Sequence, residues 1–246
     1  MSWAISSEAR AELAPGGTLR VGINHSNFLL VNPGSRHGAP TGIAPDLALE
    51  LGSRLGIPIA FASFDAAGTT ADAIRDAAVD AGFLAIEAER ASVIEFSGAY
   101  LEIPATYLVP AGSPLRSLSD VDRPGVRIAV SGRSAYDLYL TRTLKYAQLV
   151  RAEGIPGSFT LFVGQKLDAL AGLRPGLLRD AQELPGSRLL DGQFTAVQQS
   201  IGVPKNHTAA AKVLREFVED VKRLGLVAEL VEKHGVTGVN VAPPAT

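Results

Sequence analysis

Cysteine is absent from this 246-residue chain, and methionine and tryptophan occur once each. Without thiols the chain has no disulfide, no thiolate metal ligand and no cysteine nucleophile. Thiol usage therefore says nothing about the redox compartment, and packing alone must hold the fold together.

Long apolar runs are also missing. No stretch of about 18 apolar residues predicts a membrane span, so we expect no membrane insertion. The first residues, MSWAISSEARAELAPGG, have neither the basic start nor the apolar core of an export signal. We therefore expect a cytoplasmic protein if Met1 is the native start, or a periplasmic one if a signal peptide has been removed.

The chain has no strong excess of charge of either sign. Lys and Arg total 23 against 25 Asp and Glu, the formal net charge is −2, and the basic side chains are scattered along the sequence. A phosphate backbone would need a concentrated basic field. We therefore expect no nucleic-acid partner.

The motifs of common cofactor and metal sites do not occur either. The sequence contains no GxGxxG, P-loop or GxSxG motif. Its four histidines, His25, His37, His207 and His234, lack the spacing of metal ligands. We expect neither a metal nor a cofactor.

What the chain does contain is a regular alternation of apolar runs and amphipathic stretches, which begins at Leu19. This alternation predicts βαβ units and a mostly parallel sheet. Strands of a first series are expected at 19–23, 57–64 and 79–86. Helices are expected to begin at Pro45, ending at Gly56, and after a cap at Thr70.

The same pattern restarts after residue 125. Strands of this second series are expected at 126–130, 147–151 and 167–172, with an amphipathic piece at 158–166. A helix is expected to begin at Ser134, because Ser134-x-x-Asp137 has the spacing of a capping box. The last 40 residues carry apolar side chains at helical spacing and predict C-terminal helices.

Five stretches resemble a known family in their order and spacing. They are LRVGIN (19–24), GIAPDLALELGSRLG (42–56), VDAGFLAIEAERASVIEFSGAY (79–100), SLSDVDRPGVRIAVSGRSAYDLYL (117–140) and LREFVEDVKRLGLVAELVEKHG (214–235). Together they resemble the type 2 periplasmic substrate-binding proteins, the family 3 extracellular solute-binding proteins of ABC transporters. The similarity points to the branch that binds amino acids and small organic acids.

The resemblance implies an α/β protein with two doubly wound lobes and a ligand cleft between them. Lobe 1 is expected at residues 1–108 and 199–246, and lobe 2 at 109–198. Open α/β sheets bind ligands beyond the carboxyl ends of their strands. This rule singles out the loops that follow Ile23, Ile86 and Val130.

Arg90 is the main candidate in lobe 1. It follows the strand expected at 79–86 and lies in the first turn of a short helix, where unpaired N–H groups favour an anion. A guanidinium matches a carboxylate through two parallel hydrogen bonds and keeps its charge. In the family an arginine here holds the ligand's α-carboxylate. Without the resemblance, the residues favour a surface ion pair of Arg90 with Glu87.

The turn before Arg90 departs from the family pattern. It is shorter than in the family, and Ala85, Ile86 and Glu87 stand where side chains with hydroxyl groups are usual. Glu87 is therefore a second candidate for ligand contact at this turn, or else the partner of Arg90.

The loop VSGRSAYD supplies a candidate anion site in lobe 2. Ser131, Ser134 and the amides at the helix N-terminus are expected to converge as donors, and Arg133 adds positive charge. The family places ligand contacts at this position as well. The alternative is an ordinary helix cap at Ser134, and capping and binding are compatible.

The loop after the first strand offers Asn24, Asn27 and Phe28. Family members place an aromatic residue and polar groups around the ligand at this position, so Phe28 is expected to form an apolar wall. The open alternative is that Phe28 belongs to the core and that the asparagines serve turns.

The family's amino-acid binders also use an acidic residue of lobe 2 to pair with the ligand's α-ammonium. In this chain Leu173 stands at that position and Arg174 follows, so Arg174 is a further candidate contact. A buried ammonium without its anion is unfavourable. The sequence thus disfavours an ordinary α-amino acid and favours a carboxylic acid without the amine.

The expected function is that of a monomeric solute-binding protein, which closes by hinge bending over a small anionic, carboxylate-bearing metabolite. An ABC permease or a sensor would recognise the closed form. Two alternatives stay open: an enzyme similar to cyclohexadienyl dehydratases, which act on prephenate or arogenate, and a ligand-sensing domain in the cytoplasm. The dehydratase interpretation is weak because Glu87 and His25, its acid–base candidates, both have ordinary structural roles open to them.

Overall fold

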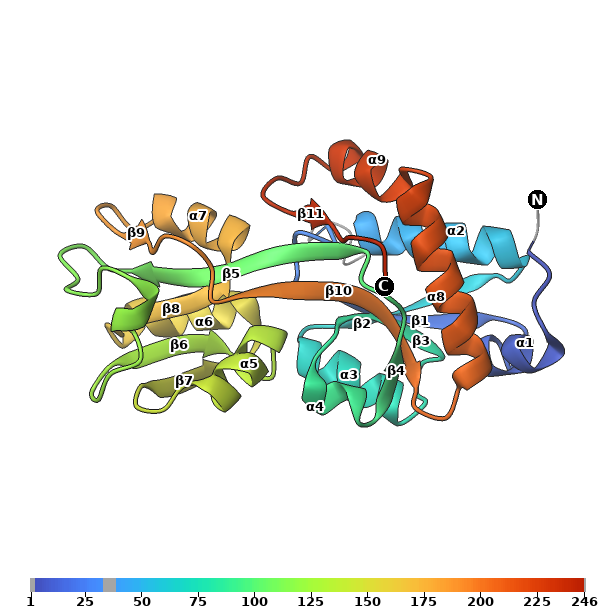
Figure 1. Cartoon of the computed structure of the whole chain (residues 1–246), viewed down its shortest axis with the longest axis horizontal. Coiled ribbons are helices and arrows are strands. Elements are labelled where there is room, and N and C mark those ends of the chain that lie inside the picture. The colour runs from blue at the N-terminus through green and yellow to red at the C-terminus, as the bar shows by residue number, and fades with distance from the viewer. Residues whose placement is uncertain (1–2, 33–38, 246) are drawn as a thin grey trace. The chain divides into compact units, whose positions relative to one another are not determined.

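A computed structural model describes residues 3–32 and 39–245 (Figure 1). The chain forms two compact units. Unit 1 runs to Glu102 and also contains Gln198–Val236 and the segment from Asn240 onward, and unit 2 comprises Ile103–Val197 with Thr237–Val239. The units thus change at Ile103, whereas the sequence places the first lobe boundary after Leu108, and the lobe boundaries stay a prediction.

The sheet of unit 1 is built on three parallel strands, β1 (Leu19–Asn24), β2 (Ile59–Phe64) and β3 (Ala81–Ala85). They lie in the order β2-β1-β3, and the part of β10 (Thr195–Pro204) from Gln198 onward pairs antiparallel with β3. The short strand β4 (Ile94–Phe96) pairs with β10, and the short strand β11 (Asn240–Val241) pairs with the start of β5 (Leu101–Val109). The three strands expected in the first series are confirmed.

Along the chain, the helices of unit 1 lie before, between and after these strands. They are α1 (Ser7–Leu13), α2 (Ile43–Leu55), α3 (Ala67–Arg75), α4 (Ala88–Ala91), α8 (Thr208–Arg223) and α9 (Leu226–Lys233). The predicted end of α2 at Gly56 is confirmed, since Gly56 adopts φ 61°. The helix begins before Pro45, however, at Ile43.

The predicted cap at Thr70 is wrong. Thr70 lies inside α3, and its hydroxyl donates to the Ala66 carbonyl oxygen at 3.0 Å. A threonine in a helix can bond back to the carbonyl four residues earlier in this way, so its side chain does not mark the helix start.

Glycines allow α3 to approach the sheet of unit 1 closely. A Cβ atom on Gly82 would lie 2.6 Å from Ile74 of α3, and one on Gly22 would lie 3.3 Å from Val79. Ile74 and Val79 belong to a buried cluster that also contains Leu84 and Ile94. The glycines therefore set the distance at which helix and sheet pack.

Unit 2 repeats the architecture. Its strands are β6 (Arg127–Ser131), β7 (Gln148–Ala152), β8 (Ala169–Leu173), β9 (Arg188–Leu189) and β5 from Ile103 onward. The order is β5-β8-β6-β7, with β6 parallel to both neighbours and β5 antiparallel to β8. The helices are α5 (Ala135–Thr143), α6 (Gly154–Gly164), α7 (Arg174–Gln182) and the 3-10 turn η2 (Leu118–Asp120).

Each unit therefore has one point where the strand order reverses. In unit 1 the chain goes from β1 outward to β2 and then to β3 on the other side, and in unit 2 it goes from β6 to β7 and then to β8. This is the doubly wound α/β fold that the sequence predicts. Crevices at such reversal points, beyond the carboxyl ends of the strands, are where this class of fold binds ligands.

Within the described ranges, no helix is both long and apolar enough to span a membrane.

Candidate functional site

The candidate residues of unit 1 lie at the reversal point of its sheet. Strands β1 and β3 are parallel and in register, with Gly22 opposite Gly82, so their carboxyl ends are level. The loop after Asn24 and the turn after Ala85 consequently leave the sheet side by side at one edge. The sequence predicts this grouping, and the strand register confirms it.

Arg90 is the third residue of α4 and is 5% exposed. Its Nη1 donates to the Ala85 carbonyl oxygen at 2.8 Å, which fixes the guanidinium against the last residue of β3. A buried guanidinium is unfavourable unless it is paired. The local fold thus holds a permanent positive charge at the carboxyl edge of the sheet.

Glu87 lies at the same edge, in the position before α4. It is 8% exposed and has extended backbone, and its carbonyl oxygen accepts from the Ala91 amide at 2.8 Å. Two residues of opposite charge are therefore buried within four positions. An ion pair of Arg90 with Glu87, the alternative considered from the sequence, would therefore be buried and not at the surface.

The loop after β1 forms a tight turn. The Asn24 side-chain oxygen accepts from the amide and hydroxyl of Ser26, at 3.0 and 2.8 Å, which is an Asx turn. His25 approaches β2, with Nε2 3.0 Å from the Ser63 hydroxyl. Asn27 is buried and Phe28 is half-buried. Asn24 therefore serves the turn, while ligand contact by Asn27 and Phe28 stays a prediction.

The candidates of unit 2 lie at the equivalent edge. Ser131 ends β6 and Ser134 is the N-cap of α5, and both are buried. The predicted cap is confirmed, since the Ser134 hydroxyl oxygen accepts from the Asp137 amide at 3.1 Å. Arg133 lies between them, exposed, with a left-handed φ of 58°.

The backbone amides of this loop are already engaged within unit 2. The Gly132 amide donates to Ala152 O at 2.8 Å, the Ser134 amide to Ser131 O at 3.2 Å, and the Arg133 amide to Asp137 Oδ2 at 2.7 Å. Fewer backbone amides of this loop are therefore available to bind an anion than the sequence predicts. The side chains of Ser131, Arg133 and Ser134 remain the candidate contacts.

Arg174 is the first residue of α7, directly after β8. Its Nη2 donates to the carbonyl oxygens of Leu190 and Gly192, at 3.1 and 2.6 Å. The guanidinium therefore ties α7 to the turn near residue 191. Leu173, the last residue of β8, is buried and brings no carboxylate to this edge. Arg174 therefore has a structural role in holding this turn, and a ligand contact by Arg174 stays a prediction.

Three residues around the unit 2 loop were not candidates from the sequence. Asp137 and Arg151 form an ion pair under the loop at 3.0 Å, and Tyr136 is 3% exposed. Burial raises the pKa of the Tyr136 phenol to about 12, so it stays protonated. The capping-box spacing marked Asp137 as a helix residue only, whereas its carboxylate in fact accepts from Arg133.

No group of three or more acidic or histidine side chains in the described ranges has a geometry that would hold a metal ion. His37 lies outside those ranges.

The profile of the bacterial extracellular solute-binding proteins, family 3, matches residues 19–237. The chain belongs to this family. It is 26% identical over 150 residues to the ABC transporter glutamine-binding protein GlnH of Bacillus subtilis, an alignment that covers 61% of this chain and 55% of that protein. The chain is thus aligned with only about half the length of this curated relative.

Solved structures show the same fold. A mutant of ArgBP from T. maritima superposes with a TM-score of 0.76 at 21% identity, over 92% of this chain and 99% of that one. An ancestral amino acid-binding protein, a precursor of cyclohexadienyl dehydratase, gives a TM-score of 0.75 at 23% identity, over 93% and 99%. At these identities the likeness establishes the periplasmic binding protein type 2 fold.

Proposed function

We propose that this protein binds a small carboxylate-bearing solute of amino-acid size, and that Arg90 holds the carboxylate. Family membership supplies the class of function. Arg90 is the observation that carries the finer statement, because it is a buried guanidinium, oriented by Ala85 O, at the reversal point of a doubly wound sheet. The names of the relatives favour an amino acid within that class.

The second set of contacts in this proposal comes from unit 2. Ser131 and Ser134 place two buried hydroxyl groups at the carboxyl end of β6, and the Arg133 side chain adds a positive charge beside them. Hydroxyl groups both donate and accept, so they suit a carboxylate or an amide on the ligand. We propose that this loop contributes contacts to the bound ligand, as the sequence predicts.

An ammonium group on the ligand would need an anionic partner. Leu173 cannot provide one, and the proposal therefore assigns this role to Glu87, which is buried at the edge that carries Arg90. If the ligand is an amino acid, Glu87 pairs with its ammonium. If it is an organic acid without an amine, Glu87 has a structural role instead.

The test is isothermal titration calorimetry of L-glutamine, L-arginine, succinate and glutarate against the wild type, Arg90→Ala, Arg90→Lys and Glu87→Gln. Truncating one member of a buried, hydrogen-bonded charge pair costs roughly 2–5 kcal/mol, so we expect Arg90→Ala to weaken binding by at least about 30-fold. Arg90→Lys keeps the charge but loses the planar fork, and an intermediate loss is expected. Glu87→Gln should weaken the binding of the two amino acids and leave the binding of succinate and glutarate unchanged.

Arg75→Ala is the matched control, because Arg75 lies in the last turn of α3 in the same unit and is paired with Asp72 and Asp76. It should leave the affinity unchanged. Wild-type affinity in Arg90→Ala would exclude the carboxylate role, and the absence of heat with every compound on the wild type would exclude this ligand class.

Catalysis is the alternative function, because the ancestral relative is named as a precursor of cyclohexadienyl dehydratase. We propose binding without turnover, in keeping with a family of binding proteins. Incubation with prephenate and arogenate tests this point: product formation by the wild type at a rate that falls in Glu87→Gln would establish an enzyme.

We further propose that the protein works outside the cytoplasmic membrane, with an ABC permease as its partner. This follows from the family, whose members are extracellular solute-binding proteins. The proposal predicts that the full-length native protein is recovered from the periplasmic or surface fraction. Recovery from the cytosol would instead support the sensing alternative.

A further inference from the structure

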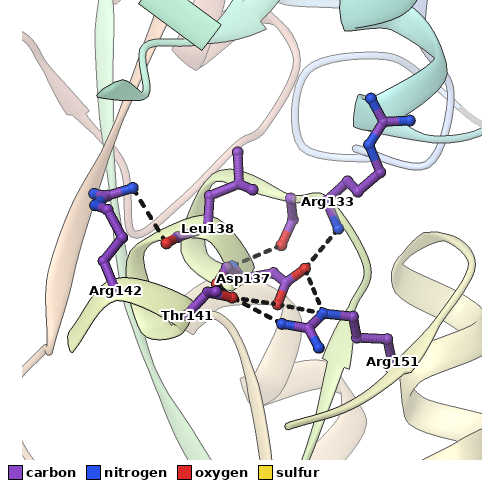
Figure 2. Close-up of polar contacts among 7 residues, drawn as sticks. Arg133, Asp137, Leu138, Thr141, Arg142 and Arg151 are labelled. Carbon is purple, nitrogen blue, oxygen red and sulfur yellow. Dashed lines mark hydrogen bonds and ion pairs between the residues drawn. The ribbon is translucent and has the colours of Figure 1, made fainter. Parts of the chain in front are cut away.

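A buried carboxylate lies beneath the loop of residues 131–134 in unit 2. Asp137 is in the first turn of α5 and is 2% exposed. Its Oδ2 accepts from the Arg133 amide at 2.7 Å, and both of its oxygens accept from Arg151 Nε, at 3.0 and 3.1 Å (Figure 2). One side chain thus joins the loop to the neighbouring strand β7.

The network extends back into α5. Arg151 Nη2 donates to the Thr141 hydroxyl at 2.7 Å, and that hydroxyl donates to the Asp137 carbonyl oxygen at 2.8 Å. Figure 2 shows the Arg151 guanidinium against Asp137 and Thr141, whereas the Arg133 guanidinium points away from them. Asp137 is therefore held in one orientation, and the Arg133 side chain takes no part in holding it.

The loop requires such support because its backbone is strained. Arg133 adopts a φ of 58°, a left-handed conformation that a residue with a Cβ atom rarely adopts without compensation. The bond from the Arg133 amide to Asp137 stabilises this conformation directly. A relaxed loop would point Arg133 and the two serine hydroxyls elsewhere.

Asp137 also changes what the helix end can bind. A carboxylate in the first turn of a helix already compensates the partial positive charge there. Here it also accepts the hydrogen bond of the Arg133 amide, which is then not available to a ligand. Contacts of this loop with a ligand must consequently come from side chains more than from the helix amides.

We propose that Asp137, held by Arg151, is a positioning residue for ligand binding: it fixes the loop so that Ser131, Arg133 and Ser134 present their side chains in the binding conformation. The inference rests on the proposed function, because it assumes that this loop contacts the ligand. It adds two residues, Asp137 and Arg151, that touch no ligand themselves.

The experiment compares Asp137→Ala, Asp137→Asn and Arg151→Met in the full chain. Affinities for L-glutamine, L-arginine, succinate and glutarate are measured by calorimetry, Tm by thermal unfolding, and exchange of the Arg133 amide by NMR in the ligand-free protein. We expect Asp137→Ala to weaken binding by about tenfold, which is the loss of one charge-assisted hydrogen bond expressed as affinity. Its Arg133 amide should exchange much faster.

The two milder variants give a graded series. Asp137→Asn retains one acceptor oxygen for the Arg133 amide, so roughly a threefold loss of affinity is expected. Arg151→Met leaves Asp137 without its anchor and should fall between the two. A purely structural role would lower Tm without this order in the affinities.

Asp122→Ala is the matched control. Asp122 is an aspartate of the same unit whose carboxylate also accepts from backbone amides, those of Lys145, Tyr146 and Ala147, but it lies at the beginning of β7 instead of the end. Its loss should lower Tm and speed exchange at those amides while leaving affinity unchanged.

Wild-type affinity in Asp137→Ala would overturn the proposal, and so would an equal loss of affinity in Asp122→Ala. If the wild type itself binds none of the four compounds, the proposed function fails and the binding role of Asp137 fails with it. The first two results leave the proposed function intact, so the failures are distinguishable.

Discussion

Asp180 is a buried acid on α7 of unit 2, with 9% of its surface exposed. Burial raises the pKa of this carboxyl group to about 6, Glu183 adds to the rise, and Arg179 opposes it. The folded pKa is above the unfolded one, so between about pH 4 and pH 6 the folded state keeps a proton that the unfolded state has released. The contribution of Asp180 to the unfolding free energy therefore falls as pH rises through this window.

Asp180→Asn removes this unfavourable charge. We expect its Tm at pH 7.5 to exceed that of the wild type by about 2–4 °C, roughly 1 kcal/mol in a chain of this size, because the carboxyl group is still partly in contact with solvent. At pH 3.5, below this window, the carboxyl group is mostly protonated in both states and the two proteins should melt together. Asp191→Asn is the control, since Asp191 is exposed, and an equal effect in both variants would contradict the role of burial.

At this scale the sequence identifies which residues carry chemistry but not how they are paired. Arg90 and Ser134 are found where the motifs predict them, one after β3 and the other capping α5. The carboxylate of Asp137 has the spacing to bond Ser134 but bonds Arg133 and Arg151 instead. That choice depends on β7, which lies beside the loop only in the folded unit, so no local pattern contains it.

At the scale of elements, Gly52 shows how tertiary packing reverses an intrinsic preference. It lies inside α2, where alanine normally stabilises a helix by roughly 1 kcal/mol relative to glycine. A Cβ atom here would lie 2.7 Å from the Ile57 carbonyl oxygen and 2.6 Å from Ile59. We expect Gly52→Ala to destabilise the protein by about 1–3 kcal/mol, measured by urea unfolding.

Gly164→Ala is the matched control and should change stability in the opposite direction. Gly164 is the last residue of α6, and a Cβ atom there would meet nothing within 4 Å. A gain of up to about 1 kcal/mol is expected. Equal effects of the two substitutions would show that helix propensity, and not the contact with residues 57–59, decides stability at Gly52.

The elements themselves were largely predictable, because buried parallel strands and amphipathic helices have distinct periods. The six strands expected in the two series are found within two residues of their predicted ends. The N-terminal helix α1 was not predicted, and neither were β5 and β10 as long strands. Both of these strands have antiparallel partners that are remote in sequence, and β5 contains Pro104, which usually argues against a strand.

At the scale of the whole molecule, Ile103–Val197, which is all of unit 2 except Thr237–Val239, is an insertion into unit 1. Glu102 and Gln198 are the unit 1 residues that flank it, and Gln198 Nε2 donates to Glu102 Oε1 at 2.7 Å. A short Gly/Ser linker can therefore replace residues 103–197. We expect the resulting chain to unfold cooperatively and to give a dispersed amide spectrum by NMR, because the cluster around Ile74 lies wholly in unit 1.

The control for this experiment is a deletion of residues 57–85, which removes β2, α3 and β3 from within unit 1 and should leave the chain unfolded. A molten globule after removal of residues 103–197 would contradict the independence of unit 1. The two-lobed organisation followed from the restart of the βαβ pattern and the family resemblance, whereas the exact change at Ile103 falls inside a continuous strand and leaves no mark in the sequence.

The single tryptophan gives the protein an unusual optical property. Trp3 packs edge-on against Phe217 at 6.3 Å and lies under the Arg54 guanidinium at 5.4 Å, at the end of α2 where the strands begin and not where they end. Its emission should therefore report the integrity of unit 1, and we expect it to stay constant when a ligand binds at the proposed site. Four of the five tyrosines, Tyr107, Tyr136, Tyr139 and Tyr146, belong to unit 2. Excitation at wavelengths that select tryptophan or include tyrosine thus lets the melting of each unit be followed in the same cuvette.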